Sequence, residues 1–67
     1  MYSILTNRER EVYELLIRNH STREIARLLG ISDKTVRNHI SNVILKLAVK
    51  GRAQAVVELI RCREIEI

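Results

Sequence analysis

The segment from residue 22 to residue 47, TREIARLLGISDKTVRNHISNVILKL, decides the fold of this chain. Its first part has the apolar spacing i, i+3, i+4 of one helix face, at Ile25, Leu28 and Leu29. Its second part continues that spacing over four positions, Val36, Ile40, Val43 and Leu47. Both apolar stripes can face one shared core. The segment therefore predicts two helices that pack against each other.

The two predicted helices meet at Gly30. A glycine readily adopts the positive φ that ends one helix and redirects the chain within a few residues. Ile31 can then turn its side chain inward, and the small Ala26 lets the two helices approach closely. Two short helices joined in this way predict a helix-turn-helix.

The face of the second helix opposite its apolar stripe is polar. It carries Lys34, Arg37, Asn38 and Ser41, flanked by Thr35, His39, Asn42 and Lys46. These side chains are hydrogen-bond donors and acceptors that suit phosphates and base edges. The pattern favours a helix that lies in a DNA groove, although any surface helix also needs a solvated polar face.

Length and composition indicate one small helical domain. With 67 residues the chain has room for a single domain, and a domain of this size buries only about 60% of its unfolded surface, so a partner would help it. Aromatic residues make up 3% and hydrophobic residues 46%. We therefore expect an interior built from Leu, Ile, Val and Ala.

The positive charge is concentrated near the second helix of the helix-turn-helix. The formal net charge is +4, which alone is weak evidence for a polyanion partner. Residues 30–52 hold five basic side chains and one acid, whereas residues 53–67 hold two basic side chains and three acids. The single Cys62 cannot form an internal disulfide, and no signal peptide or long apolar run is evident. We therefore expect a protein of a reducing cytoplasm.

Capping signatures define the predicted helix starts. Thr6 with Glu9, and Ser21 with Glu24, each have the spacing of a capping box. These pairs predict a first helix from about residue 7 to residue 17, with the stripe Val12, Leu15 and Leu16, and a second helix from about residue 22. Ser32 is expected to cap the third helix, with Asp33 in its first turn. There a carboxylate interacts favourably with the positive end of the helix dipole.

A fourth helix is predicted from Arg52 to about Arg63, after a break at residues 48–51. Its apolar residues are Val56, Leu59 and Ile60, with Ala53, Ala55, Val57 and Cys62 on the flanks. This apolar sector is too wide for one core contact. The tail at residues 64–67 alternates but is too short to predict a strand. The predicted fold is all-α, a compact four-helix domain over residues 1–67 with a central helix-turn-helix.

A set of residues spread along the chain matches the pattern of one known family: Leu5-Thr6, Arg8-Glu9, Glu11-Val12, Glu24-Ile25-Ala26, Leu29, Ile31-Ser32, Thr35-Val36, His39, Lys46-Leu47, Val49, Arg52 and Ala55-Val56. Through these residues the chain resembles the LuxR-type, or GerE-type, helix-turn-helix family over nearly its whole length. Through NREREVYELL, KTVRNHISN and VKGRAQAVVELIR, the chain is most similar to a small stand-alone sporulation regulator of that family. Two turn positions depart from the family pattern: Asn19-His20 and Ala48 stand where glycine is common.

The resemblance implies a homodimeric transcription regulator that binds promoter DNA, activates or represses, and touches RNA polymerase. Its third helix would enter the major groove and its fourth would pack against a second copy. Many relatives carry this domain behind a phosphoreceiver or ligand-binding domain, and we expect none here.

The resemblance and the side-chain chemistry together assign residue roles. The expected base-facing residues are Lys34, Arg37, Asn38, Ser41 and Asn42. The expected phosphate contacts are Arg23, Thr35, His39, Lys46, Lys50 and Arg52, the last two in the loop before the fourth helix. The expected dimer interface is Ala53, Val56, Val57 and Ile60. The alternatives are a structural hydrogen bond for His39, an ion pair with a surface acid for Arg23, and burial in the domain's own core for the apolar residues of the fourth helix.

Several other functions are not supported by the sequence. His20 and His39 lack a Cys or carboxylate partner at metal-ligand spacing, so we expect no metal. We also expect no cofactor, no small-molecule ligand and, because there is no long apolar run, no membrane contact. The sequence has no acid-base pair, phosphate loop or activated nucleophile that would suggest an enzyme. Two alternatives are the promoter-reading end of a sigma factor, which would act as a monomer with core polymerase, and a helical interaction module without a DNA role.

Overall fold

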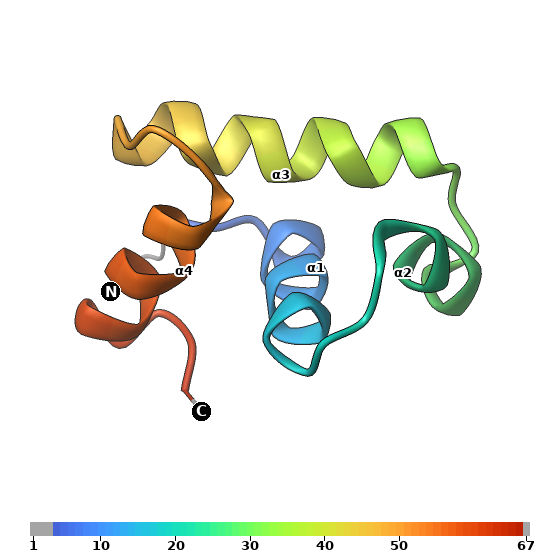
Figure 1. The fold of residues 1–67 in the computed structure, drawn as a ribbon, viewed down its shortest axis with the longest axis horizontal. Coiled ribbons are helices and arrows are strands. Elements are labelled where there is room, and N and C mark those ends of the chain that lie inside the picture. Colours follow the sequence, from blue (N-terminus) through green and yellow to red (C-terminus); the bar gives the residue numbers. More distant parts are fainter. Residues whose placement is uncertain (1–3, 67) are drawn as a thin grey trace.

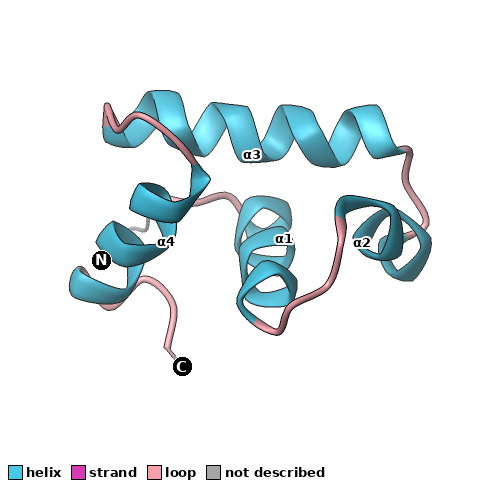
Figure 2. Cartoon of the chain, in the orientation of Figure 1, coloured by secondary structure: helices cyan, strands magenta, loops and turns pink. Residues whose placement is uncertain are grey.

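The structure, a computed structural model, describes residues 4–66. This part of the chain forms four helices (Figure 1). They are α1 (Asn7–Ile17), α2 (Thr22–Leu29), α3 (Asp33–Leu47) and α4 (Arg52–Arg61). The longest, α3, extends across one side of the molecule and contacts each of the other three, while short loops make the connections (Figure 2). The predicted fold class, all-α with a central helix-turn-helix formed by α2 and α3, is confirmed.

The predicted caps form at the first three helix starts. The Thr6 hydroxyl accepts from the Glu9 amide at 3.1 Å, and the Glu9 carboxylate accepts from the Thr6 amide at 2.9 Å. Ser21 and Glu24 form the same reciprocal pair, and the Ser32 hydroxyl accepts from the Thr35 amide at 3.0 Å. The predicted bounds of α1 and start of α2 are confirmed. The predicted start of α4 at Arg52 is confirmed, so the placement of Arg52 in the preceding loop was wrong, and the helix ends at Arg61, two residues before the predicted end.

These four helices all end in the same hydrogen-bonded turn. In each, a residue with left-handed backbone precedes one whose amide donates to a carbonyl five residues back, which is the Schellman arrangement. The left-handed residues are Asn19 (φ 70), Gly30 (φ 69), Ala48 (φ 56) and Arg63 (φ 59). Asparagine tolerates this conformation, whereas alanine there is strained by about 1–2 kcal/mol. The two departures from the family's glycines therefore leave the turn geometry intact.

The core lies where α1, α2 and α4 meet the inner side of α3. Its fully buried side chains include Val12, Ile25 and Leu59. Two expectations about it were wrong. Tyr13 is fully buried, and its hydroxyl donates to the Ile40 carbonyl at 2.9 Å, so an aromatic ring does belong to the interior. Leu28, expected in the apolar stripe of α2, is 59% exposed because it lies at the edge of that stripe, about 100° around the helix from Leu29.

The residues after α4 complete the domain. Ile65 is only 2% exposed and belongs to the core. The guanidinium of Arg10 on α1 donates to the backbone carbonyl of Glu64 and lies 3.0 Å from its carboxylate. This part of the tail is therefore anchored, although it forms no strand; Ile67 lies outside the described residues.

No helix between residues 4 and 66 is long and apolar enough to cross a membrane.

Candidate nucleic-acid interface

Helix α3 has two opposite stripes of side chains. The inner stripe, Val36, Ile40, Val43 and Leu47, packs in or against the core, with the first three buried. The outer stripe has the same spacing two residues earlier, at Lys34, Asn38, Ser41 and Leu45, and all four are exposed. Because two residues correspond to about 200° around a helix, the outer stripe points directly away from the core.

The five residues expected to face bases are brought together on this exposed side. Three of them, Lys34, Asn38 and Ser41, belong to the outer stripe, and Arg37 and Asn42 lie on either side of it. Their side chains present ammonium, guanidinium, amide and hydroxyl groups along one helix. This set can hydrogen-bond to base edges in a groove that admits a helix.

Arg37 lies between an acid and a second arginine. Its guanidinium is 4.0 Å from the carboxylate of Asp33, one turn earlier on α3. On its other side is a shallow hollow of about 230 Å³, lined by Arg37, Ile40, Ser41, Ile44 and Arg52. Arg52, the first residue of α4, thus shares a hollow with the polar side of α3. Two guanidinium groups and a hydroxyl around an open hollow suit a phosphate oxygen.

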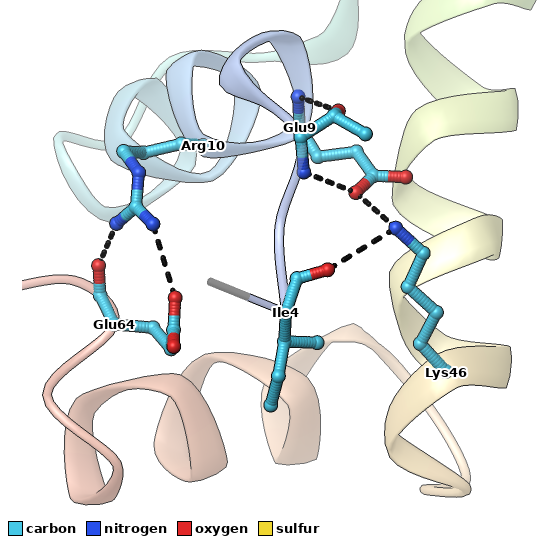
Figure 3. A network of polar contacts seen from close by, with 6 residues as sticks. Ile4, Glu9, Arg10, Lys46 and Glu64 are labelled. Atoms are coloured by element: carbon cyan, nitrogen blue, oxygen red, sulfur yellow. Dashed lines mark hydrogen bonds and ion pairs between the residues drawn. The ribbon is translucent and has the colours of Figure 1, made fainter. Parts of the chain in front are cut away.

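On the opposite flank, Lys46 has protein partners. Its ammonium is 2.5 Å from the Glu9 carboxylate and donates to the Ile4 carbonyl at 3.3 Å, so it bridges α3, α1 and the segment before α1 (Figure 3). Glu9 is only 3% exposed. Burial raises the pKa of the Glu9 carboxyl, but the hydrogen bonds from Lys46 and Thr6 outweigh it and hold the pKa below its ordinary value. Lys46 therefore neutralises a buried carboxylate, a role that the sequence did not indicate.

The other residues expected at phosphates differ in exposure. Thr35 and His39 are half-buried on the same flank as Lys46, and the Thr35 hydroxyl is within 2.9 Å of the Ser32 hydroxyl. Arg23 is exposed in the first turn of α2. Lys50 is exposed in the loop before α4, where its amide donates to the Gln54 side chain. The phosphate-contact set is thus spread over three helices and a loop.

Helix α4 divides the residues expected at a dimer interface. Val56 and Ile60 are partly buried and pack against the domain's own core, whereas Ala53 and Val57 are exposed. The exposed pair borders an apolar hollow of about 320 Å³, lined by Val49, Ala53, Gln54, Val57 and Glu58. These four residues therefore lie on two sides of α4, with Val56 and Ile60 toward the core and Ala53 and Val57 toward solvent.

Other chemistry-bearing side chains form no site in the described part of the chain. His20 lies 3.6 Å from Glu24, a carboxylate partner that the sequence analysis missed. No three His, Cys, Asp or Glu side chains between residues 4 and 66 are grouped for a metal ion. Cys62 is exposed beside Glu58, and desolvation and that carboxylate raise the pKa of its thiol, which disfavours a nucleophilic thiolate.

Comparison with known sequences identifies the relatives of this chain. Residues 3–59 match the family described as "Bacterial regulatory proteins, luxR family". The chain is 64% identical over 64 residues to the spore germination protein GerE of Bacillus subtilis (strain 168), covering 96% of this chain and 86% of that protein. It is 52% identical over 58 residues to the transcriptional regulatory protein DegU of Brevibacillus brevis, covering 87% of this chain but 25% of DegU.

Comparison with solved structures gives the same result. The structure of the transcription factor GerE superimposes with a TM-score of 0.92 at 59% sequence identity and covers 94% of both chains. The resemblance noted in the sequence is confirmed.

Proposed function

This chain belongs to the LuxR family of bacterial regulatory proteins and is therefore a DNA-binding transcription regulator and not an enzyme, and from that premise we propose that it binds promoter DNA sequence-specifically as a homodimer. Helix α3 enters the major groove with its outer stripe. The observation that carries this proposal is that stripe: it is exposed, it is polar at Lys34, Asn38 and Ser41, and it points away from the core.

Base contacts are assigned to the exposed side chains of α3. Arg37 can donate two hydrogen bonds to guanine O6 and N7, and Asn38 can pair with adenine through both atoms of its amide. Lys34, Ser41 and Asn42 complete this set. N-terminal residues of a recognition helix are the ones that usually reach base edges, which agrees with the position of Lys34 and Arg37 in the first turns of α3.

Phosphate contacts are assigned to the flanking residues. Arg52 and Arg37 border the hollow between α3 and α4, so a phosphate beside Arg52 is adjacent to the base-reading residues. Arg23, Thr35, His39 and Lys50 extend the set on either side. Lys46 is also assigned a phosphate contact, which its ammonium makes while it remains paired with Glu9. Each phosphate that is neutralised should steepen the log-log salt dependence of binding by about 0.9.

The second copy is assigned to the exposed side of α4. Ala53 and Val57 border the apolar hollow, and Val49 extends it toward α3. Val56 and Ile60 back this surface from the core side. Burial of these apolar side chains against a second copy would favour association and add to a core that is small for a stable domain.

The biological role is proposed from the relatives. GerE of Bacillus subtilis is a spore germination protein by name, and 64% identity over 96% of this chain supports a role in regulating sporulation genes. In that role the protein acts on the chromosome in the cytoplasm, touches RNA polymerase, and activates or represses according to the promoter.

The test is a chromatin pull-down from sporulating cells, with sequencing of the bound DNA for the wild-type protein and for Arg37→Ala. We expect discrete promoter peaks that share a two-fold symmetric motif in the wild type, and broadened or lost peaks in the variant. An absence of enriched promoters would overturn the proposal.

A second measurement separates base reading from charge. On purified duplexes, Arg37→Ala should weaken binding to the motif by about 1–3 kcal/mol and relax the preference at one position. Binding to random duplexes should change little. Equal losses on motif and random DNA would contradict the base-facing assignment of Arg37.

A further inference from the structure

Leu45 is an apolar side chain on an otherwise polar stripe. It is 77% exposed, which makes it the most exposed large apolar side chain among residues 4–66. One exposed leucine on a protein surface is ordinary. Its position on the outer stripe of α3, in register with Asn38 and Ser41, is what makes it informative.

The geometry places Leu45 along the same line as the proposed base-reading residues. It follows Ser41 by four residues and Asn38 by seven, so it lies about 6 Å and about 10.5 Å further along α3 on the same side. Leu45 lies in the last turn of α3, so it reaches base edges where the helix follows the groove beyond Asn38, at base pairs about two to three steps away. This inference rests on the proposed function.

The chemistry of leucine restricts what it can recognise there. An isobutyl side chain can neither donate nor accept a hydrogen bond, so it cannot pair with a base edge or a phosphate oxygen. The 5-methyl group of thymine is the apolar feature that the major groove presents. Contact with it removes two apolar surfaces from water. We propose that Leu45 is a specificity-determining residue that contacts the 5-methyl group of a thymine in each half-site.

The experiment removes that methyl group and the leucine, separately and together. A duplex is first selected from a random library by the full-length wild-type protein. Each thymine in the selected site is then replaced in turn by deoxyuridine, which deletes the methyl group and keeps every hydrogen-bonding atom. Affinities are measured for the wild type and for Leu45→Ala, a substitution at an exposed position by the best helix-forming residue.

The expected result is a coupling at one position. One thymine-to-uracil replacement per half-site should weaken wild-type binding about fourfold, the ratio that corresponds to about 0.8 kcal/mol for one buried methyl group. The same replacement should leave the affinity of Leu45→Ala unchanged. Leu28→Ala is the matched control, because Leu28 is also an exposed leucine but lies on α2, and it should keep the wild-type response.

Three results would overturn the inference: no methyl deletion affects the wild type, the deletion affects wild type and Leu45→Ala equally, or the selected site has no thymine within reach of α3. These results differ from failure of the proposed function. If no duplex is enriched in the selection, sequence-specific binding itself fails; if a motif is enriched without coupling at Leu45, only the role of Leu45 fails.

Discussion

The inner and outer stripes of α3 have the same spacing but opposite exposure to solvent. Val36, Ile40 and Val43 are buried, whereas Asn38 and Ser41 are exposed. Asn38 precedes Ile40 by two residues, and Ser41 precedes Val43 by two. The inner stripe is constrained by packing, because a protein core is so densely packed that a change in the volume of a buried side chain disturbs its neighbours. The outer stripe is constrained by nothing within the domain. Substitutions on the two stripes should therefore have separable effects, one on folding and the other on binding.

The largest effect is expected on the inner stripe. Ile40→Ala should lower the free energy of unfolding by about 2–5 kcal/mol, because it leaves a cavity beneath α3. Since a domain of this length is expected to have only about 3–10 kcal/mol in total, part of the population should be unfolded at 37 °C. Urea denaturation followed by circular dichroism measures the change. The adjacent Ser41→Ala is the control and should change stability by less than about 0.5 kcal/mol; similar losses in both would break the distinction.

The reverse pattern is expected on the outer stripe. Asn38→Ala should weaken binding to the selected motif by about 1–3 kcal/mol while the urea midpoint stays at the wild-type value. Fluorescence anisotropy on motif and random duplexes, paired with the denaturation curve, measures both quantities. A shifted midpoint, or an equal loss on random DNA, would show that Asn38 acts through the fold or the backbone instead of a base.

The flank between the stripes should respond to acid. The pKa of Glu9 is lower in the folded protein than its ordinary value of 4.5, so its contribution to stability is present above that pH and is lost as the pH falls through the lower folded value. Glu9→Gln should cost about 1–2 kcal/mol at pH 7, because Lys46 loses a charged partner. The deficit should shrink below pH 4.5 in urea melts at several pH values.

The exposed Glu14→Gln is the matched control for that titration, since its side chain is not in the core. It should follow the wild-type pH profile. A Glu9→Gln deficit that persisted undiminished at pH 3 would mean that the lost contact is not the ion pair with Lys46.

The smallest effect is expected where both stripes of α3 end. Ala48 has a left-handed backbone, so Ala48→Gly should relieve about 1–2 kcal/mol of strain and lose about 0.5–1 kcal/mol to chain entropy, for a net gain of about 0–1.5 kcal/mol. Gly30→Ala is the mirror experiment. Nothing lies within 4 Å of an added Cβ at Gly30, so backbone strain alone should destabilise it by a similar amount. Shifts of the same sign in the two variants would contradict this account.

Local signals in the sequence predicted most of the fold. Thr6 with Glu9 and Ser21 with Glu24 marked helix starts because a capping box involves residues only three apart. The core position of Val36 and Ile40 followed from periodicity. Tyr13 was left out of the predicted interior because a low aromatic content does not say where one ring lies. Leu28 was placed on the core face because periodicity assigns a face but not what covers it.

The candidate site was predicted as a set of residues but not as a set of contacts. The exposure of Lys34, Asn38 and Ser41 follows from their offset from the apolar stripe. The pairing of Lys46 with Glu9 joins residues 37 apart and depends on how α1 crosses α3, which no local pattern encodes. Leu45 has the same spacing, but it is apolar and does not belong to the polar set from which base-facing residues were predicted.

The tail after α4 bears on how this domain can be moved between proteins. The stretch that matches the family stops at residue 59, yet Ile65 fills part of the interior and Glu64 is held by Arg10. The unit that sequence comparison delimits is thus shorter than the unit that folds. A chimera that joins this domain to another protein should keep the chain through residue 66. A domain cut at the family boundary would lack Ile65 and leave part of its hydrophobic core exposed to solvent.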